Sequence, residues 1–175
     1  MLLGVLKRLY FLILQRRKPV LYARRIGVRI GNNCKLVSVN GGTFGRQPYL
    51  VKIRNHVEIS GNVHFITHDG GAWVFRQKHP KLDVFSPIEI GNNVFVGYGS
   101  ILLPGTIVED NCVVGAGSIV RGRLLTNGVY AGSPVKRIKE IDEYLDQLMK
   151  RSAETKILND DEKRRILCKK FGIKK

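Results

Sequence analysis

The sequence has few cysteines, no long apolar run and no acidic residue near its start, and each of these absences excludes a class of protein. Its 175 residues include three widely spaced cysteines, which form neither a disulfide framework nor a CxxC metal site. No segment reaches the ~20 apolar residues that a membrane-spanning helix needs. The opening MLLGVLKRLYFLIL lacks the basic start and the cleavage site of a signal peptide. We therefore expect a cytoplasmic protein, with peripheral contact at the inner membrane face as the one membrane association left open.

Positive charge dominates the composition and is concentrated at the two ends. The chain has 30 Lys and Arg residues against 14 Asp and Glu, for a formal net charge of +16. Residues 1–25 contain seven basic and no acidic residues, and residues 136–175 contain thirteen basic and eight acidic residues. Such an excess favours an anionic partner. A nucleic-acid-binding protein is one alternative, although the middle of the chain has neither a recognition helix nor a stacking-aromatic motif.

Large apolar residues recur every six positions through the middle of the chain. They are Ile53, Ile59 and Phe65, then Ile90, Val96, Leu102, Val108, Val114 and Val120. A period of six is neither the 3.6 of a helix nor a plain strand alternation. It predicts a solenoid of short strands in which each unit buries one large side chain against its neighbours. An antiparallel β-domain with turns at IGNN and VEDN is the alternative.

The repeat units IGNNVF, VGYGSI, LLPGTI, VEDNCV and VGAGSI resemble those of the hexapeptide-repeat acyltransferases, and in particular the sugar and capsular polysaccharide O-acetyltransferases. The resemblance covers roughly residues 26–140, closing with AGSPVKRI. It implies a mainly β fold, a left-handed parallel β-helix, assembled as a homotrimer. It also implies an acetyl-coenzyme A-dependent O-acetyltransferase, acting on a cell-surface or capsular saccharide or its precursor, with no metal required.

The domain organisation follows from the extent of the repeat. Residues 1–25 form an amphipathic basic segment, residues 26–135 the β-helix with a loop excursion at 69–86, and residues 136–175 a C-terminal helical extension. The excursion is visible as a break in period. After Phe65 the next large residue is due at position 71 but appears at Ile90, so nineteen residues are extra. An excursion of this length is usually functional or disordered.

His68 lies at the start of the excursion, in FITHDGG. In the family that the repeats resemble, a histidine at this position is the general base, and His68 matches it. An imidazole, with an unperturbed pKa of ~6.5, can accept the proton of an attacking hydroxyl near neutral pH. From the residues alone, a structural histidine at the end of a strand is the alternative.

The donor side of the site is also assigned by the resemblance. The backbone amide of Tyr98, in VGYGS, matches the donor that faces the thioester carbonyl, where it would stabilise the developing oxyanion. The side chain is larger than the usual small residue. Basic residues would meet the coenzyme phosphates as point charges. The remaining coenzyme-binding positions are Ala116 and Gly117 for the pantetheine arm, Lys136 and Lys139 for the phosphates, and Arg121, where relatives carry a Thr-Lys pair.

The acceptor side is less clear in the sequence. Asn40 aligns with an acceptor-contacting asparagine of the sugar acetyltransferases, and Asp69 and Trp73 are further candidates for binding the saccharide. Gln47 stands where many relatives carry an acidic residue. A zinc lyase of the β-helix carbonic anhydrase type is a further alternative, but it needs three converging ligands, and the histidine spacing does not match.

Helical spacing appears at both ends of the chain. Near the start, Leu2, Leu6, Leu9 and Ile13 share one face, which predicts a helix that either caps the β-helix or lies on an anionic membrane. Near the end, a second apolar face comprises Ile138, Ile141, Leu145, Leu148 and Met149. A last helix is expected to begin after Asn159, which is a good N-cap residue.

Overall fold

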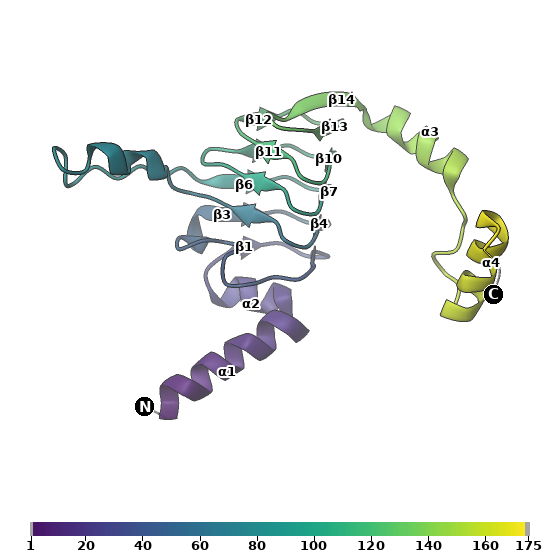
Figure 1. Ribbon diagram of the computed structural model, residues 1–175, viewed down its shortest axis with the longest axis horizontal. Helices are drawn as coiled ribbons and strands as arrows, with labels where there is room; N and C mark the ends of the chain where they lie inside the picture. The colour runs from purple at the N-terminus through teal and green to yellow at the C-terminus, as the bar shows by residue number, and fades with distance from the viewer. Residues whose placement is uncertain (1, 174–175) are drawn as a thin grey trace. The chain divides into compact units, whose positions relative to one another are not determined.

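The structure is a computed structural model that describes residues 2–173, without the side chains of Leu2, Leu3 and Lys7. Residues 1, 174 and 175, which belong to the predicted terminal segments, lie outside it. Two compact units are present, and the first ends at Ile141. This first unit contains three sheets that the chain visits in turn, so that consecutive strands as far as β13 belong to different sheets and pair in parallel with strands of the neighbouring coils (Figure 1).

The strands of each sheet come from successive turns of the chain. Sheet A contains β1 (Arg29–Ile30), β3 (Val51–Ile53), β6 (Ile88–Ile90), β9 (Ile107–Val108) and β12 (Arg123–Leu124). Sheet B contains β2 (Lys35–Leu36), β4 (Val57–Ile59), β7 (Val94–Val96), β10 (Cys112–Val114), β13 (Gly128–Ala131) and β14 (Lys136–Glu140). Sheet C contains β5 (His64–Phe65), β8 (Ile101–Leu102) and β11 (Ile119–Val120). This is the coil geometry of a parallel β-helix.

The six-residue markers form the core, as the sequence predicts. All nine of them are buried. They stack between coils in register, so that Ile53 pairs with Ile90 and Ile90 with Val108. Buried small polar residues close the turns, since the hydroxyls of Ser118 and Thr106 donate to backbone carbonyls at 2.6 and 2.7 Å. Each coil is thereby held by its neighbours, and burial of the markers supplies the main stabilisation.

The corner between sheets A and B, which we call the asparagine corner (residues 31–34, 54–56, 91–93, 109–111 and 125–127), is closed by side chains. The side-chain oxygens of Asn55, Asn92 and Asp110 accept hydrogen bonds from backbone N–H groups one coil away, at 2.9, 3.2 and 2.7 Å. The hydrogen bonds from Asn92 to Asp110, together with the nearby charge of Arg54, lower the pKa of the Asp110 carboxyl.

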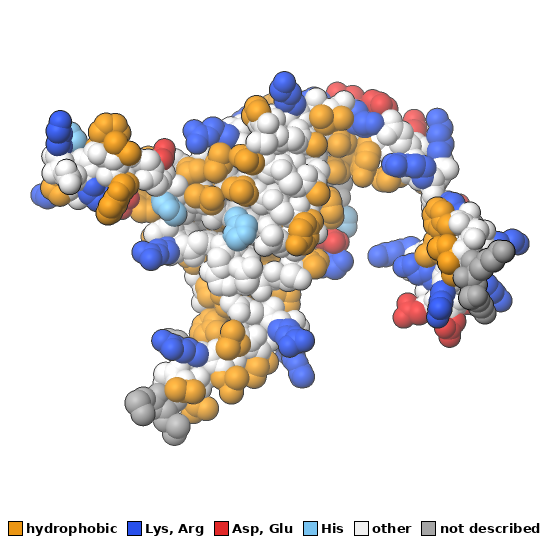
Figure 2. Space-filling view, viewed as in Figure 1, with side chains coloured by type: hydrophobic (Ala, Val, Ile, Leu, Met, Phe, Trp, Pro, Cys, Tyr) orange, Lys and Arg blue, Asp and Glu red, His pale blue; other side chains and the backbone are white. Residues whose placement is uncertain are grey.

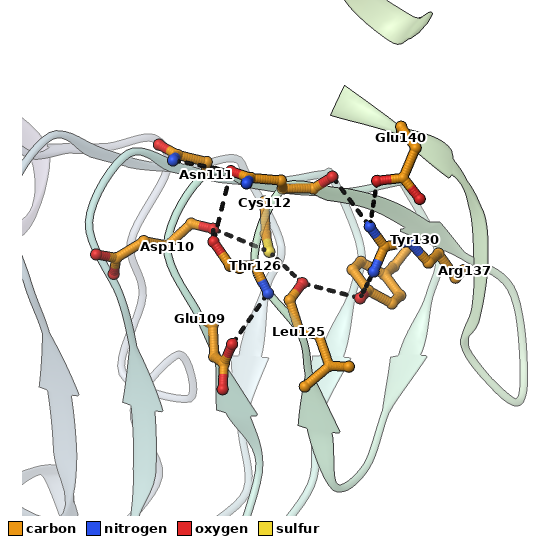
Figure 3. Close-up of polar contacts among 10 residues, drawn as sticks. Glu109, Asp110, Asn111, Cys112, Leu125, Thr126, Tyr130, Arg137 and Glu140 are labelled. Carbon is orange, nitrogen blue, oxygen red and sulfur yellow. Dashed lines mark hydrogen bonds and ion pairs between the residues drawn. The ribbon is translucent and has the colours of Figure 1, made fainter. Parts of the chain in front are cut away.

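A second ladder of side chains runs through the same corner. Asn93 donates to Asn111 at 2.9 Å and Asn111 to Asn127 at 3.0 Å, while His56 lies 2.8 Å from the Asn93 oxygen. All four residues have left-handed backbone, with φ between 54° and 56°. Asparagine tolerates that conformation better than most residues. Figure 3 shows the last two coils of this corner, where the Thr126 hydroxyl also donates to the Asp110 carbonyl at 2.8 Å.

The excursion leaves the β-helix after β5 and returns at β6, and it forms a projecting arm (Figure 1). A short 3-10 helix, η2 (Gly70–Phe75), occupies its first part, and another, η1 (Pro48–Leu50), precedes β3. Its apolar residues are largely uncovered, since Trp73 and Val74 are each 76% exposed.

Two helices precede the first strand. In α2 (Pro19–Arg25), Tyr22 and Ala23 are buried against the end of the β-helix, and Arg24 donates to the Ile30 and Gly31 carbonyls at 3.3 and 2.6 Å. Helix α1 (Leu2–Arg17) contributes the buried Leu14 to the same core and then extends away from it (Figure 1). Capping is therefore the work of α2 and the last turns of α1.

The C-terminal part differs from the expected boundary at residue 136. Residues 136–140 form β14, an antiparallel partner of β13, so Ile138 lies in a strand and is not on a helical face. The reason is that the last parallel strand would otherwise expose an unpaired edge. Helix α3 (Ile141–Arg151) follows, and α4 (Asp160–Phe171) begins after Asn159, whose side chain accepts from the Glu162 N–H at 2.9 Å as predicted. None of the described helices is both long and apolar enough to cross a bilayer.

Candidate active site

His68 lies at the base of the arm, where the outgoing and returning segments pair. Asp69 N–H donates to the Val84 carbonyl at 3.0 Å, and Ser86 N–H donates to the Thr67 carbonyl at 2.9 Å. His68 itself forms an antiparallel bridge with Phe85, and the two rings are 6.4 Å apart. The side chain alternates outward from the buried Thr67 and is exposed. Two backbone bonds thus fix the position from which the imidazole faces solvent.

Asp69 and Trp73, the candidates beside His68, are placed by the start of the arm. The Asp69 carboxylate caps η2 by accepting from the Gly71 N–H at 2.9 Å. Among the described residues it makes no hydrogen bond to the His68 ring. An orienting role for Asp69 stays a prediction, as does the role of Trp73, which the arm presents to solvent.

Asn40 lies in a turn alongside β5, next to the histidines. Its side-chain oxygen accepts from the Gly42 N–H at 2.8 Å, and the Thr43 carbonyl of the same turn accepts from the Phe65 N–H at 2.8 Å. The His64 ring lies 3.4 Å from the Gly42 carbonyl. The fold therefore brings Asn40 to the strand that leads into His68, although its oxygen already serves the turn.

The corner between sheets B and C, which we call the glycine corner (residues 60–63, 97–100 and 115–118), has small residues stacked coil upon coil. A Cβ on Gly97 would lie 2.5 Å from the Ala116 nitrogen, so no larger residue fits without a shift of the backbone. Gly99 and Gly117 have φ of +71° and +68°, a conformation that glycine adopts without strain. Close packing and left-handed turns both require glycine here.

This corner leaves backbone donors exposed. The Tyr98 carbonyl accepts from the Gly117 N–H at 2.8 Å. Among residues 2–173, however, the N–H groups of Tyr98 and Ala116 donate to no acceptor. Both residues are exposed at this corner, so their N–H groups are unpaired donors on residues that a bound ligand can reach.

The Tyr98 ring, which is larger than the sequence pattern of relatives suggests, lies over the coil below. A Cβ on Gly61 would be 3.2 Å from its Cε2 atom, so the ring covers Gly61. The ring is thus directed towards the coil that contains Gly61. Ala116 and Gly117, on the opposite neighbouring coil, remain exposed. The amide and the two small residues are brought together on one surface.

The basic candidates lie at different distances from the glycine corner. Lys136 is in register with Ala131, whose Cβ would be 2.9 Å from a Cβ on Gly115, so it lies beside the corner. Lys139 is three residues farther along β14, in register with Val129. Arg121 follows β11 and is exposed at the other edge of sheet C. The fold therefore groups Lys136 with the small residues and separates Arg121 from them.

His68 and the Tyr98 amide are not brought together within one chain. Tyr98 precedes β8, whereas His68 follows β5, and β5 pairs with β8 through Phe65 and Leu102. The two groups therefore lie beyond opposite ends of the sheet C strands, separated by the length of those strands. Within one chain, the predicted base and the predicted oxyanion donor are therefore apart.

Two buried polar atoms were not anticipated from the sequence. The Thr67 hydroxyl and the Gln47 side-chain oxygen are buried and have no hydrogen-bond partner among the described residues. Thr67 is an inward-facing polar residue directly before the candidate base, and strand alternation is the signal that could have identified it. Among the described residues, no three His, Cys, Asp or Glu side chains converge as a metal site. Cys112 is buried in the core, which raises the pKa of its thiol.

Comparison with known proteins identifies the same six-residue repeat. A family model described as the hexapeptide repeat of succinyl-transferase matches residues 87–121. Protein CapG of Staphylococcus aureus is 45% identical over 166 residues, which is 95% of this chain and 96% of that protein. Galactoside O-acetyltransferase of Escherichia coli (strain K12) is 34% identical over 126 residues, 71% of this chain and 60% of that protein.

A solved structure of a galactoside acetyltransferase in complex with coenzyme A has the same fold. Its TM-score is 0.53 at 22% sequence identity, and the match covers 79% of this chain and 80% of that chain. The predicted left-handed parallel β-helix is confirmed by this and similar matches.

Proposed function

The chain belongs to the hexapeptide-repeat acetyltransferases, and we propose that it transfers an acetyl group from acetyl-coenzyme A to a hydroxyl of a saccharide. Support for a saccharide acceptor comes from the relative that is named for galactoside O-acetylation. Support for the donor comes from the similarly folded acetyltransferase that binds coenzyme A. A cytoplasmic location stays a prediction, and the three unpaired cysteines fit it.

The observation that carries the proposal is the Tyr98 N–H on the glycine corner, which belongs to an exposed residue and has no acceptor among the described residues. A thioester carbonyl placed there would accept that N–H, and the bond would strengthen as the oxygen gains negative charge. The neighbouring Ala116 and Gly117 leave room for a slender pantetheine arm along the corner. Lys136, beside the same corner, would meet the coenzyme phosphates, with Lys139 and Arg121 at more distant positions.

The reaction itself needs one base and one oxyanion donor. The acceptor hydroxyl attacks the thioester carbon while the His68 imidazole takes its proton, and a C–O bond forms. The tetrahedral oxygen is stabilised by the Tyr98 N–H. The C–S bond then breaks, and the imidazolium returns the proton to the departing coenzyme A thiolate. Donor and acceptor bind together, so no acyl-enzyme intermediate is required.

The separation of His68 and Tyr98 favours an assembly of several copies. Because the two residues lie at opposite ends of the sheet C strands, a complete site forms where His68 of one subunit faces the glycine corner of a neighbour. A homotrimer with three sites between subunits satisfies this arrangement. The exposed Val74 and Phe75 of the arm would be covered by the same neighbour.

The acceptor would bind around the base of the arm. Asp69 and Trp73 flank His68, and Asn40 lies by the preceding strand. An exposed aromatic ring is a suitable surface for the apolar face of a sugar, and carboxylate and amide groups accept or donate to its hydroxyls. Which saccharide, and which hydroxyl, would be decided by groups that a neighbouring subunit adds.

The test is release of coenzyme A from acetyl-coenzyme A, measured over a panel of free sugars and lipid-linked sugars. For the best acceptor, His68→Ala should lower kcat by a factor of about 10²–10⁴, because only general-base assistance is removed. His79→Ala is the matched control, since His79 is also exposed but lies out along the arm, and it should change kcat less than about twofold. Equal activity of the two variants would exclude His68 as the base.

A further inference from the structure

Helix α1 is only partly used by the fold of this chain. Its Leu14 is buried in the core, and Phe11 packs edge-to-face on Tyr22 of α2 at 5.9 Å between ring centroids. These contacts, with α2 itself, cover the open end of the β-helix. The rest of α1 therefore has no capping work to do.

The opposite face of α1 is apolar and uncovered. The exposed residues on it, with fractions between 43% and 60%, are Val5, Leu6, Leu9, Tyr10, Leu12 and Ile13. A helix that is apolar around most of its surface is normally buried, in a protein core or in lipid. A contiguous exposed patch of this kind marks an interaction site. At ~1.5 Å per residue, the 16 residues of α1 form a helix of roughly 24 Å, which is shorter than the ~30 Å hydrocarbon core of a bilayer. Such a helix would lie in an interface and would not span a bilayer.

The charge around α1 indicates which interface it fits. The last turn of α1 carries Arg16 and Arg17, and Lys18 follows directly. The first acidic residue in the chain is Glu58, preceded by twelve basic residues. Figure 2 shows hydrophobic side chains along the projecting helix, with Lys and Arg side chains beside them. An apolar helix with a purely cationic flank complements an anionic lipid surface, where each near-surface cation contributes ~1 kcal/mol. Two copies of this segment would instead repel each other.

We propose that the exposed face of α1 docks this protein on an anionic lipid bilayer, with the apolar residues from Val5 to Ile13 entering the headgroup and acyl boundary and Arg16, Arg17 and Lys18 contacting lipid phosphates. This goes beyond the proposed acetyl transfer and does not depend on it. It would place the enzyme next to saccharides carried on lipids.

The test is co-sedimentation of the full-length protein with phosphatidylcholine vesicles that contain ~30% phosphatidylglycerol, at low salt. The double variant Leu9→Glu/Ile13→Glu places two charges on the exposed face and should reduce partitioning at least ~10-fold. Ile157→Glu, at a residue that is 93% exposed in the other unit, is the matched control and should bind like the wild type. Arg16→Gln/Arg17→Gln should reduce partitioning about 30-fold, from two cations at ~1 kcal/mol each and ~1.4 kcal/mol per tenfold.

Thermal melting keeps the test interpretable, since all four substituted α1 residues are exposed and the variants should melt within a few degrees of the wild type. Wild-type protein that ignores the anionic vesicles would overturn the proposal. So would a Leu9→Glu/Ile13→Glu variant that binds vesicles like the control but dissociates into smaller assemblies by light scattering, because α1 would then be a contact between copies. Because the readout is lipid binding, failure of the acetyl-transfer proposal would not affect it.

Discussion

The asparagine corner and the glycine corner each turn the chain once per coil, but they differ in the polar groups that they present at the surface. At the asparagine corner, side-chain oxygens accept backbone N–H groups from the next coil, and Asn93, Asn111 and Asn127 bond to one another. At the glycine corner the turn residues are small apart from Tyr98 and Asn62, and the Tyr98 and Ala116 N–H groups have no acceptor among the described residues.

In this repetitive fold, one corner therefore contributes mainly to stability and the other is suited to binding. At the asparagine corner the ladder side chains pair with one another and with backbone, whereas the glycine corner has unused backbone donors beside small residues, which offer a ligand both hydrogen bonds and space. The two corners should therefore respond differently to substitution: one in catalysis, the other in stability.

The largest effect is expected from removing the exposed amide of the glycine corner. The Ser100 N–H donates to the Gly97 carbonyl, and Gly99 has φ of +71°, which is the pattern of a type II turn with Tyr98 at its second position. Proline suits that position and has no N–H. Tyr98→Pro should therefore lower kcat by ~100–1,000-fold, or ~3–4 kcal/mol, in an acetyl-transfer assay.

The matched control for that substitution is Tyr98→Ala, which removes the ring over Gly61 but keeps the N–H. It should retain kcat within about tenfold, with both variants melting close to the wild type. If Tyr98→Pro and Tyr98→Ala lose the same activity, the ring and not the amide matters, and the oxyanion assignment is wrong.

The second prediction concerns the stacking of the glycine corner. Gly97→Ala would place a Cβ 2.5 Å from the Ala116 nitrogen, and backbone cannot move aside as a flexible side chain can. We expect a loss of ~3 kcal/mol in the free energy of unfolding, by chemical denaturation, together with weaker coenzyme binding. Gly41→Ala, where a Cβ meets nothing within 4 Å, should cost less than ~0.5 kcal/mol. A neutral Gly97→Ala would show that the coils are not closely stacked here.

The asparagine corner should respond in stability alone. Asn111→Ala removes two ladder bonds and leaves alanine at φ of 55°, so unfolding free energy should fall by ~1–2 kcal/mol while kcat per folded molecule is unchanged. Asn111→Gly relieves the backbone strain but not the lost bonds, and should therefore cost less. A fall in kcat for either variant would contradict the separation of the two corners.

The smallest effect is a pH dependence at the same corner. Hydrogen bonds from Asn92 hold the pKa of Asp110 below its unfolded value, so its contribution is present above pH ~4 and is lost as pH falls through the folded pKa. Asp110→Asn keeps an acceptor oxygen but removes the charge. At pH 7 it should be less stable by under ~1 kcal/mol, and the difference from wild type should shrink as pH falls through the folded-state pKa of Asp110. A difference that persists in acid would assign the contribution to packing instead.

Much of the coil geometry could be predicted from the sequence, because one buried side chain per six residues is a strong signal. Ile90, Val96 and Leu102 are buried as expected, and the nineteen-residue break correctly marks the arm. The open corner could not be identified in this way. Gly91 and Gly97 each follow a marker and look alike, but a Cβ on Gly91 would meet the Asp110 side chain at 2.4 Å, whereas one on Gly97 would meet bare backbone.

The ends of the chain were harder to predict for a related reason. Strand β14 forms because the last parallel strand needs a partner, which is a property of the folded edge and not of the residues 136–140. The pattern in α1 likewise fits both a cap and a membrane helix; the structure shows the capping contact at Leu14, which is buried, and leaves Leu9 exposed. His68 is predicted as the base by resemblance alone, and the fold adds that the Tyr98 amide lies at the opposite end of the sheet C strands.

The most direct test of the difference between the two corners is backbone amide hydrogen exchange of the wild-type protein, with and without saturating coenzyme A. Exchange should slow at Tyr98 and Ala116 when the coenzyme is bound, because their N–H groups, which have no acceptor among the described residues, are then covered, and should be unchanged at residues 91–93 and 109–111. Protection at the asparagine corner, or none at the glycine corner in a protein that has bound coenzyme A, would contradict the account.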